Sequence, residues 1–206
     1  MSALVIVDMQ NDFMPGGALP VAGGDKLVPV INQLMDHYSP VLATKDWHPK
    51  DHVSFAANHP GKKEGEVISF KGTDQILWPI HCVQETEGAN FVSGLSEEKI
   101  DHIVYKGTDP KIDSYSGFFD NKGLRKTGLE DFLRNQHIEE IAVVGVATDY
   151  CVLYTVLDAL KLGFSVVVVE DGCAGVNLQP DDEQRALEAM RKAGAIIQTF
   201  SEATSL

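Results

Sequence analysis

The chain has 206 residues, of which 44% are hydrophobic and 23% charged, as in an ordinary soluble globular protein. With 30 acidic residues against 17 basic ones, the net charge of -13 repels nucleic-acid phosphates and anionic membranes, so we expect neither as a partner. The apolar runs are too short to span a bilayer, and the N-terminus lacks the basic start and cleavage site of a signal peptide. Three widely spaced cysteines are typical of a reducing compartment, which predicts a cytoplasmic protein.

Short apolar runs alternate with helical patterns along the chain. Continuous rather than alternating runs predict parallel strands that are buried on both faces, over residues 3–7, 41–44, 102–105, 141–146, 165–169 and 195–199. Helices are expected over residues 26–37, 127–135, 149–162 and 181–192, with Asp25 as the cap of the first and Gly163 and Gly194 closing the last two. This order predicts a doubly wound α/β fold, with a mainly parallel six-stranded sheet and helices on both faces.

Residues 48–100 form a long connection with little periodicity, rich in Gly, Pro, His and aromatic residues. Such a segment is too long for a plain loop, so we expect an active-site excursion with some local structure. We expect residues 1–206 to form one domain that includes this excursion.

Four chemically notable residues each follow the end of a predicted strand, namely Asp8, Asp46, Lys106 and Ala147. In doubly wound sheets, sites gather beyond the carboxyl ends of the strands. These residues are therefore expected to lie near one another at one edge of the sheet.

Cys151 follows the strand over 141–146 and a short turn, and it is expected in the first turn of the next helix. Unpaired N–H groups and the helix dipole at that place favour a thiolate, the nucleophilic form of cysteine. Considered alone, Cys151 is better explained as a buried structural cysteine, because free cysteines are among the most buried residues. Its neighbours decide between these interpretations.

Asp8 and Lys106 also each have more than one explanation. Asp8 could be a general base, a metal ligand or a structural cap of the following turn, and Lys106 could be an ordinary surface lysine. Beside a carboxylate and a thiol, however, a lysine would favour the thiolate and stabilise negative charge in a transition state. No glycine-rich dinucleotide fingerprint follows the first strand, so we expect no organic cofactor.

A metal site is suggested by Asp46, His48 and His81. Residues two apart on an extended chain point to the same side, so Asp46 and His48 can converge on one ion, and His81 could provide a third ligand. One carboxylate and two imidazoles suit a catalytic divalent ion: zinc first, with iron or manganese as alternatives. The alternative explanation is that Asp46 is a solvated aspartate and that His48 and His81 are surface histidines. His52 and His59 lie in the same stretch and are either additional ligands or surface residues.

Several motifs together resemble the nicotinamidases, a family of isochorismatase-like cysteine hydrolases. In chain order they are VDMQNDF at Asp8, TKDWHP with HVSF over 44–55, LWPIHC over 77–82, YKG at Lys106, YSGF over 115–118 and GVATDYC at Cys151. The match covers nearly the whole chain, and the long loop before LWPIHC resembles the nicotinamidases more than the metal-free isochorismatases.

The resemblance implies roles for individual residues. It implies a catalytic triad of Asp8, Lys106 and Cys151, and metal ligands Asp46, His48 and His81, with His52 as a further ligand in some relatives. It also implies that Phe13, Trp78 and Tyr115 line the substrate pocket. Finally, it implies a cis peptide bond before Ala147 that turns the N–H groups of Ala147 and Cys151 toward the substrate. Cys82 and Cys173 gain no such partners and are expected to be structural.

The implied reaction is the hydrolysis of nicotinamide, and of pyrazinamide, through a cysteine thioester. Another amidase of this fold, acting on a carbamoyl compound or a different aromatic amide, would share Asp8, Lys106 and Cys151. A non-catalytic binding module and a dinucleotide-dependent oxidoreductase are the alternatives from other classes. The expected partner is a small-molecule substrate. The sequence does not decide between a monomer and a homo-oligomer.

Overall fold

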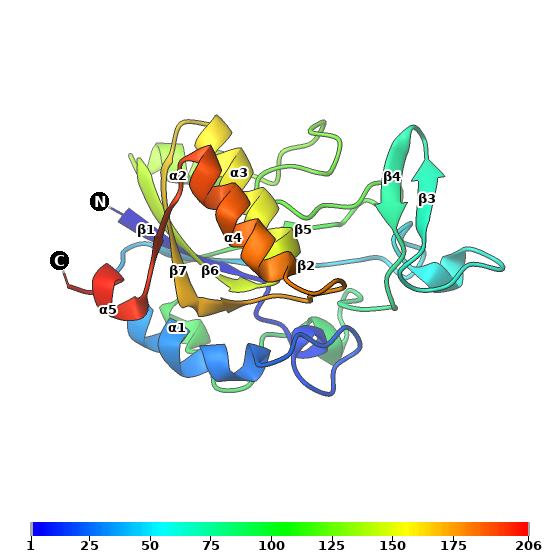
Figure 1. Cartoon of the computed structure of the whole chain (residues 1–206), viewed down its shortest axis with the longest axis horizontal. Helices are drawn as coiled ribbons and strands as arrows, with labels where there is room; N and C mark the ends of the chain where they lie inside the picture. Colours follow the sequence, from blue (N-terminus) through cyan, green and yellow to red (C-terminus); the bar gives the residue numbers. More distant parts are fainter. Residues whose placement is uncertain (1, 206) are drawn as a thin grey trace.

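The computed structural model describes residues 2–205 and contains a six-stranded parallel sheet (Figure 1). The strand order is β5-β2-β1-β6-β7-β8. The strands are β1 (Ser2–Val7), β2 (Val41–Asp46), β5 (His102–Lys106), β6 (Glu140–Val146), β7 (Ser165–Ala174) and β8 (Ile196–Gln198). The predicted parallel sheet of six strands is confirmed, although β2 and β7 run further than the apolar runs alone indicated.

Helices cover both faces of the sheet, as predicted (Figure 1). On one face lie α1 (Val28–Leu34) and the short α5 (Phe200–Ala203). On the other face lie α2 (Leu129–Asn135), α3 (Leu153–Lys161) and α4 (Asp182–Ala193). Because both faces are covered, the central strands have no polar face, which explains their continuous apolar runs.

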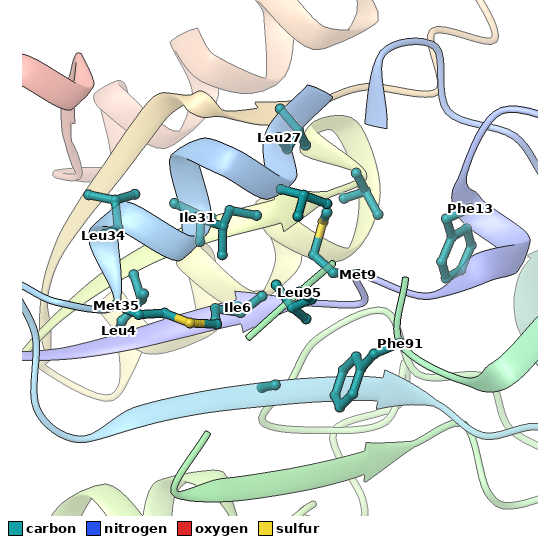
Figure 2. Packing of buried hydrophobic residues seen from close by; sticks show 14 of the residues in the cluster. Leu4, Ile6, Met9, Phe13, Leu27, Ile31, Leu34, Met35, Phe91 and Leu95 are labelled. Atoms are coloured by element: carbon teal, nitrogen blue, oxygen red, sulfur yellow. The ribbon is translucent and has the colours of Figure 1, made fainter. Parts of the chain in front are cut away.

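The central strand β1 divides its side chains between two cores. Leu4 and Ile6 pack with Ile31 of α1 on one face (Figure 2). Val5 packs with Val156 of α3 on the other face. Alternate side chains of a strand point to opposite faces, so one short segment stabilises both layers.

Two helix predictions need correction at their N-terminal ends. The helix expected from residue 26 begins as a 3₁₀ turn, Gly24–Leu27, and is α-helical only over α1. Pro29 lacks an N–H and fits only the first turn of an α-helix, so the regular helix begins at Val28. Asp25 lies inside the 3₁₀ turn and makes no capping hydrogen bond. Similarly, Thr148–Val152 forms a π-helical turn before α3.

The excursion over residues 48–100 contains a β-hairpin that the sequence analysis did not identify. Its strands β3 (Val67–Phe70) and β4 (Thr73–Ile76) pair antiparallel beside the main sheet (Figure 1). Lys71 and Gly72 at the turn both have positive φ angles, 51° and 77°, as tight hairpin turns require. Within residues 2–205, no helix has the length and apolar content needed to cross a bilayer.

Candidate active site

The sheet brings the predicted reactive residues to one edge. Asp46 and Lys106 end the adjacent strands β2 and β5 and are register partners. Asp8 directly follows β1, and Cys151 follows β6, which pairs with β1. Residues far apart in the sequence therefore meet because parallel strands all end at the same edge.

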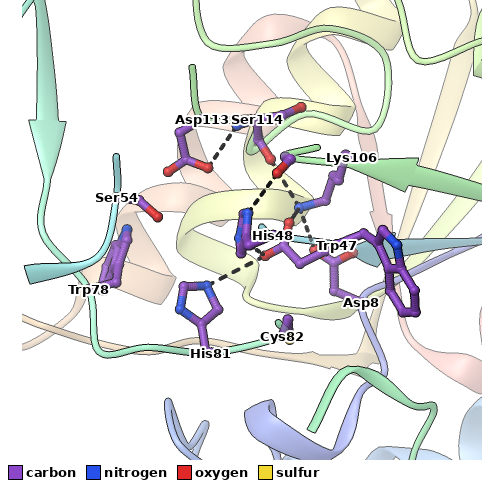
Figure 3. Close-up of polar contacts among 12 residues, drawn as sticks. Asp8, Trp47, His48, Ser54, Trp78, His81, Cys82, Lys106, Asp113 and Ser114 are labelled. Carbon is purple, nitrogen blue, oxygen red and sulfur yellow. Dashed lines mark hydrogen bonds and ion pairs between the residues drawn. The ribbon is translucent and has the colours of Figure 1, made fainter. Parts of the chain in front are cut away.

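The ammonium group of Lys106 is the centre of this cluster (Figure 3). Its Nζ lies 2.7 Å from Oδ2 of Asp8 and 2.5 Å from Oδ1 of Asp46. The same Nζ donates to the carbonyl oxygen of Ser114 at 3.1 Å and lies 3.3 Å from Sγ of Cys151. Lys106 is only 1% exposed, which excludes the surface-lysine explanation.

Burial and charge push the pKa values of the two carboxyl groups apart. Burial raises the pKa of Asp8, and the Lys106 ammonium offsets only part of that rise. Burial would also raise the pKa of Asp46, but Lys106 and His48 outweigh it and hold this pKa well below its usual range. Burial alone would lower the pKa of Lys106, yet Asp46 and Asp8 keep it well above its ordinary value. Lys106 is therefore a fixed cation, and Asp8 is the more basic carboxylate.

Cys151 lies in the π-helical turn Thr148–Val152, directly before α3, and its side chain is buried. The peptide bond between Val146 and Ala147 is cis, as the resemblance implied. Gly145 lets β6 approach β1 closely, because a Cβ atom there would lie 2.1 Å from the carbonyl oxygen of Val7.

The burial of Cys151 opposes the thiolate that its place near a helix N-terminus favours. Burial raises the pKa of its thiol well above the usual value, the Lys106 ammonium opposes this rise, and the carboxylates of Asp8 and Asp46 add to it. Desolvation thus outweighs the Lys106 charge, and the resting residue is a thiol that needs a base.

Asp46, His48 and His81 form a buried cluster whose possible ligand atoms all lie within 4.8 Å of one another. Nε2 of His48 is 3.5 Å and Nε2 of His81 is 3.8 Å from Oδ2 of Asp46. Each ring is oriented through Nδ1, which lies 2.9 Å from the carbonyl oxygen of Gly107 in His48 and 2.8 Å from that of Pro79 in His81. Such contacts at Nδ1 leave Nε2 free to bind a metal ion.

His52 adds a third imidazole beside this cluster. Nδ1 of His52 lies 2.7 Å from Oγ of Ser54, while its buried Nε2 has no hydrogen-bond partner within residues 2–205. Together with His48 and Asp113 it forms a second group of possible ligands. Burial and His48 lower the pKa of His52 to about 4, so it is neutral near pH 7, the form that binds metals. An orphaned imidazole nitrogen beside one carboxylate and two oriented imidazoles fits a divalent cation.

A pocket with an empty volume of about 360 Å³, its open mouth included, lies over Cys151. The predicted residues Phe13, Trp78, Tyr115 and Ala147 line it together with Asp46, His81 and Cys151. Nε1 of Trp78 donates to the Tyr115 hydroxyl at 3.1 Å, which fixes one aromatic wall. The aromatic side chains beside Cys151 suit a flat aromatic ring.

Other pocket-lining residues were not identified from the sequence. They are Leu19, Asp113, Tyr150 and Val176. Tyr150 could have been found as the neighbour of Cys151, whereas Leu19 and Val176 are apolar residues on loops, for which the sequence holds no signal. Cys82, Cys173 and His59 are not among the lining residues; Nε2 of His59 instead lies 2.7 Å from the carbonyl oxygen of Val53.

Comparison with known proteins identifies the family. The family model described as the isochorismatase domain matches residues 2–202. The chain belongs to the isochorismatase family. The nicotinamidase of Escherichia coli K12 is 48% identical to it over 204 residues, which cover 97% of this chain and 95% of that protein.

Solved structures of isochorismatase-family proteins share this fold. An Acinetobacter baumanii nicotinamidase and pyrazinamidase superposes with a TM-score of 0.94 at 44% identity, covering 98% of this chain and 97% of that one. A Pyrococcus horikoshii pyrazinamidase in complex with zinc gives 0.78 at 41% identity, covering 96% and 98%. The predicted family and fold class are confirmed, as is the predicted enzyme class of an amidohydrolase acting on an amide C–N bond.

Proposed function

We propose that this isochorismatase-family enzyme hydrolyses nicotinamide to nicotinate and ammonia through a thioester on Cys151, and that it also accepts pyrazinamide. The observation that carries the proposal is that Asp8 and Lys106 meet behind Cys151, which lines a pocket that also presents Asp46 and His81. The nicotinamidase and pyrazinamidase relatives support the choice of substrate.

In the proposed first step Asp8 takes the proton of the Cys151 thiol, and the sulfur attacks the amide carbon. A base is needed because burial keeps the pKa of the thiol high. The fixed charge of Lys106 stabilises the thiolate as it forms. The N–H groups of Ala147 and Cys151 hold the oxyanion of the tetrahedral intermediate, and the loss of one such donor typically costs about 10²–10³ in rate.

The second half of the reaction returns the enzyme to its resting state. Asp8 gives its proton to the departing nitrogen, the C–N bond breaks, and ammonia leaves behind a thioester. Asp8 then removes a proton from water as its oxygen attacks the thioester carbon. The C–S bond breaks, the sulfur regains a proton from Asp8, and the carboxylic acid product loses its remaining proton to solvent and leaves as nicotinate.

We further propose that Asp46, His48 and His81, with His52 as a possible fourth ligand, hold one divalent metal ion, zinc before iron or manganese. The donor set, the two oriented rings and the orphaned Nε2 of His52 support this assignment. A metal ion there would supply a Lewis acid that anchors the pyridine nitrogen. Phe13, Trp78 and Tyr115 would contact the ring faces and edges.

The composition of the chain bears on the compartment and the partners of the enzyme. We infer that residues 1–206 act as a single domain in the cytoplasm on a small-molecule substrate, with no nucleic-acid or membrane partner. The net charge of -13 and the three free cysteines support this inference.

Release of ammonia from a set of amides tests the substrate. We expect nicotinamide and pyrazinamide to be hydrolysed with a higher kcat/KM than benzamide, which has the same shape but no ring nitrogen, and than an N-carbamoyl amino acid. Preference for the carbamoyl compound would favour the alternative amidase. Equal rates with nicotinamide and benzamide would contradict the anchoring of the ring nitrogen.

A further inference from the structure

Asp8 has an unusual backbone conformation directly after β1. Its φ angle is 49°, in the left-handed region that residues other than glycine rarely adopt. Its side chain is fully buried, so solvent cannot hold the carboxylate in place. Something in the interior must fix both the backbone and the side chain of Asp8.

The hydroxyl of Thr44 contacts both parts of Asp8. Oγ1 of Thr44 accepts a hydrogen bond from the backbone N–H of Asp8 at 3.2 Å. The same hydroxyl donates to Oδ1 of Asp8 at 2.6 Å. Thr44 lies on β2, beside β1, and is itself 0% exposed, so this two-bond clamp is entirely internal.

The clamp divides the two oxygens of the Asp8 carboxylate between different tasks. Oδ1 is occupied by Thr44, whereas Oδ2 lies 2.7 Å from Nζ of Lys106 and has no other polar partner among the described residues. Ligand atoms of Asp8 and Cys151 lie within 4.8 Å of each other. Thr44 therefore holds one carboxylate oxygen, and the other faces the Lys106 ammonium, which also contacts Sγ of Cys151.

The methyl group of Thr44 has a separate, structural role. A Cβ atom built on Gly117 would lie 3.1 Å from Cγ2 of Thr44, so the methyl group packs tightly against that backbone. The hydroxyl and the methyl group can be removed one at a time, because valine keeps the shape of threonine and serine keeps its hydroxyl.

We propose that Thr44 is a positioning residue for the reaction, whose hydroxyl orients Asp8 so that Oδ2 exchanges protons with Cys151. This inference rests on the proposed function, in which Asp8 is the general base. A misoriented base slows proton transfer but does not change how the pocket holds the substrate, so kcat is affected and KM is not.

Three substitutions separate this role from packing. Thr44→Val should lower kcat with nicotinamide about 10- to 100-fold and leave KM within about threefold, because it removes only the hydrogen bonds to Asp8. Thr44→Ser should keep kcat within about threefold of the wild type. Near-UV circular dichroism and metal content are measured on each variant. Should Thr44→Val not fold, Thr44→Ala against Thr44→Ser is the deciding pair, since both lack the methyl group and differ only in the hydroxyl.

Alkylation of Cys151 provides a readout that needs no substrate. With iodoacetamide and peptide mapping by mass spectrometry, Thr44→Val should react at least about fivefold more slowly at Cys151 than the wild type and Thr44→Ser. Failure of the wild type to release ammonia from nicotinamide would overturn the proposed function and leave this comparison intact. The positioning role is overturned if Thr44→Val keeps kcat and the alkylation rate within twofold of the wild type, or if Thr44→Ser loses as much as Thr44→Val.

Discussion

Nζ of Lys106 lies 3.3 Å from Sγ of Cys151 in the protein interior, and the same ammonium group contacts both Asp8 and Asp46. One buried cation thus links the proposed nucleophile, the proposed base and a candidate metal ligand. Buried carboxylates are costly unless a positive charge compensates them. A single lysine can compensate two carboxylates and a thiolate only if all three side chains surround it.

Replacing Cys151 tests the nucleophile. Cys151→Ala should reduce the release of ammonia by more than about 10³-fold, because no other group can carry the acyl intermediate. Binding of nicotinamide, measured by isothermal titration calorimetry, should persist. Cys173→Ala is the matched control and should keep its turnover, since Cys173 does not line the pocket. Turnover of Cys151→Ala within tenfold of the wild type would reject the assignment.

Replacing Lys106 tests the central cation. Lys106→Met should lower the free energy of unfolding by about 3–5 kcal/mol, because it leaves buried carboxylates without their counter-charge. Urea denaturation measures the change. Lys99→Met removes an exposed ion pair with Asp36 and should cost no more than about 1 kcal/mol. Equal effects of the two substitutions would show that Lys106 does not stabilise the site.

Replacing the candidate metal ligands tests the metal site. Asp46→Ala and His81→Ala should each strip the metal ion, as measured by inductively coupled plasma mass spectrometry. With His81→Ala the KM for nicotinamide should rise at least about tenfold, since a ring anchor is lost. His59→Ala, a histidine outside the cluster, should keep the wild-type metal content. Unchanged metal content in both ligand variants would contradict the ligand set.

The pH dependence of stability tests the buried, neutral state of His52. Its pKa is lowered from 6.5 to about 4 in the folded protein, so above pH 6.5 neither state binds the proton. As the pH falls from 6.5 to about 4, the His52 ring binds a proton in the unfolded state but not in the folded state. The free energy of unfolding therefore falls by about 3 kcal/mol at most.

This loss should be visible in urea titrations of the metal-free protein, prepared with EDTA. His52→Gln removes the titrating ring, so its stability should fall less steeply over the same pH window. Parallel curves for the wild type and His52→Gln would show that His52 is not buried in its neutral form.

The sequence by itself determined the parallel sheet and predicted which residues would meet at its carboxyl edge. Continuous apolar runs such as Ile141 to Val146 suffice to predict parallel strands, because a strand covered on both faces carries apolar side chains on both faces. Asp8 and Lys106 were recognised because each directly follows such a run. That the side chains of Asp46 and His48 point to the same side followed from the two-residue period of an extended chain alone.

Only the tertiary structure decided how these groups behave. The place of Cys151 before a helix favours a thiolate, but burial raises the pKa of that thiol, and burial depends on packing from the whole fold. The β3–β4 hairpin was missed because its strands are only four residues long, and β4 is mostly polar. The clamp of Thr44 on Asp8 and the placement of Val176 in the pocket wall join residues distant in the chain, and no local pattern of side chains encodes such a contact.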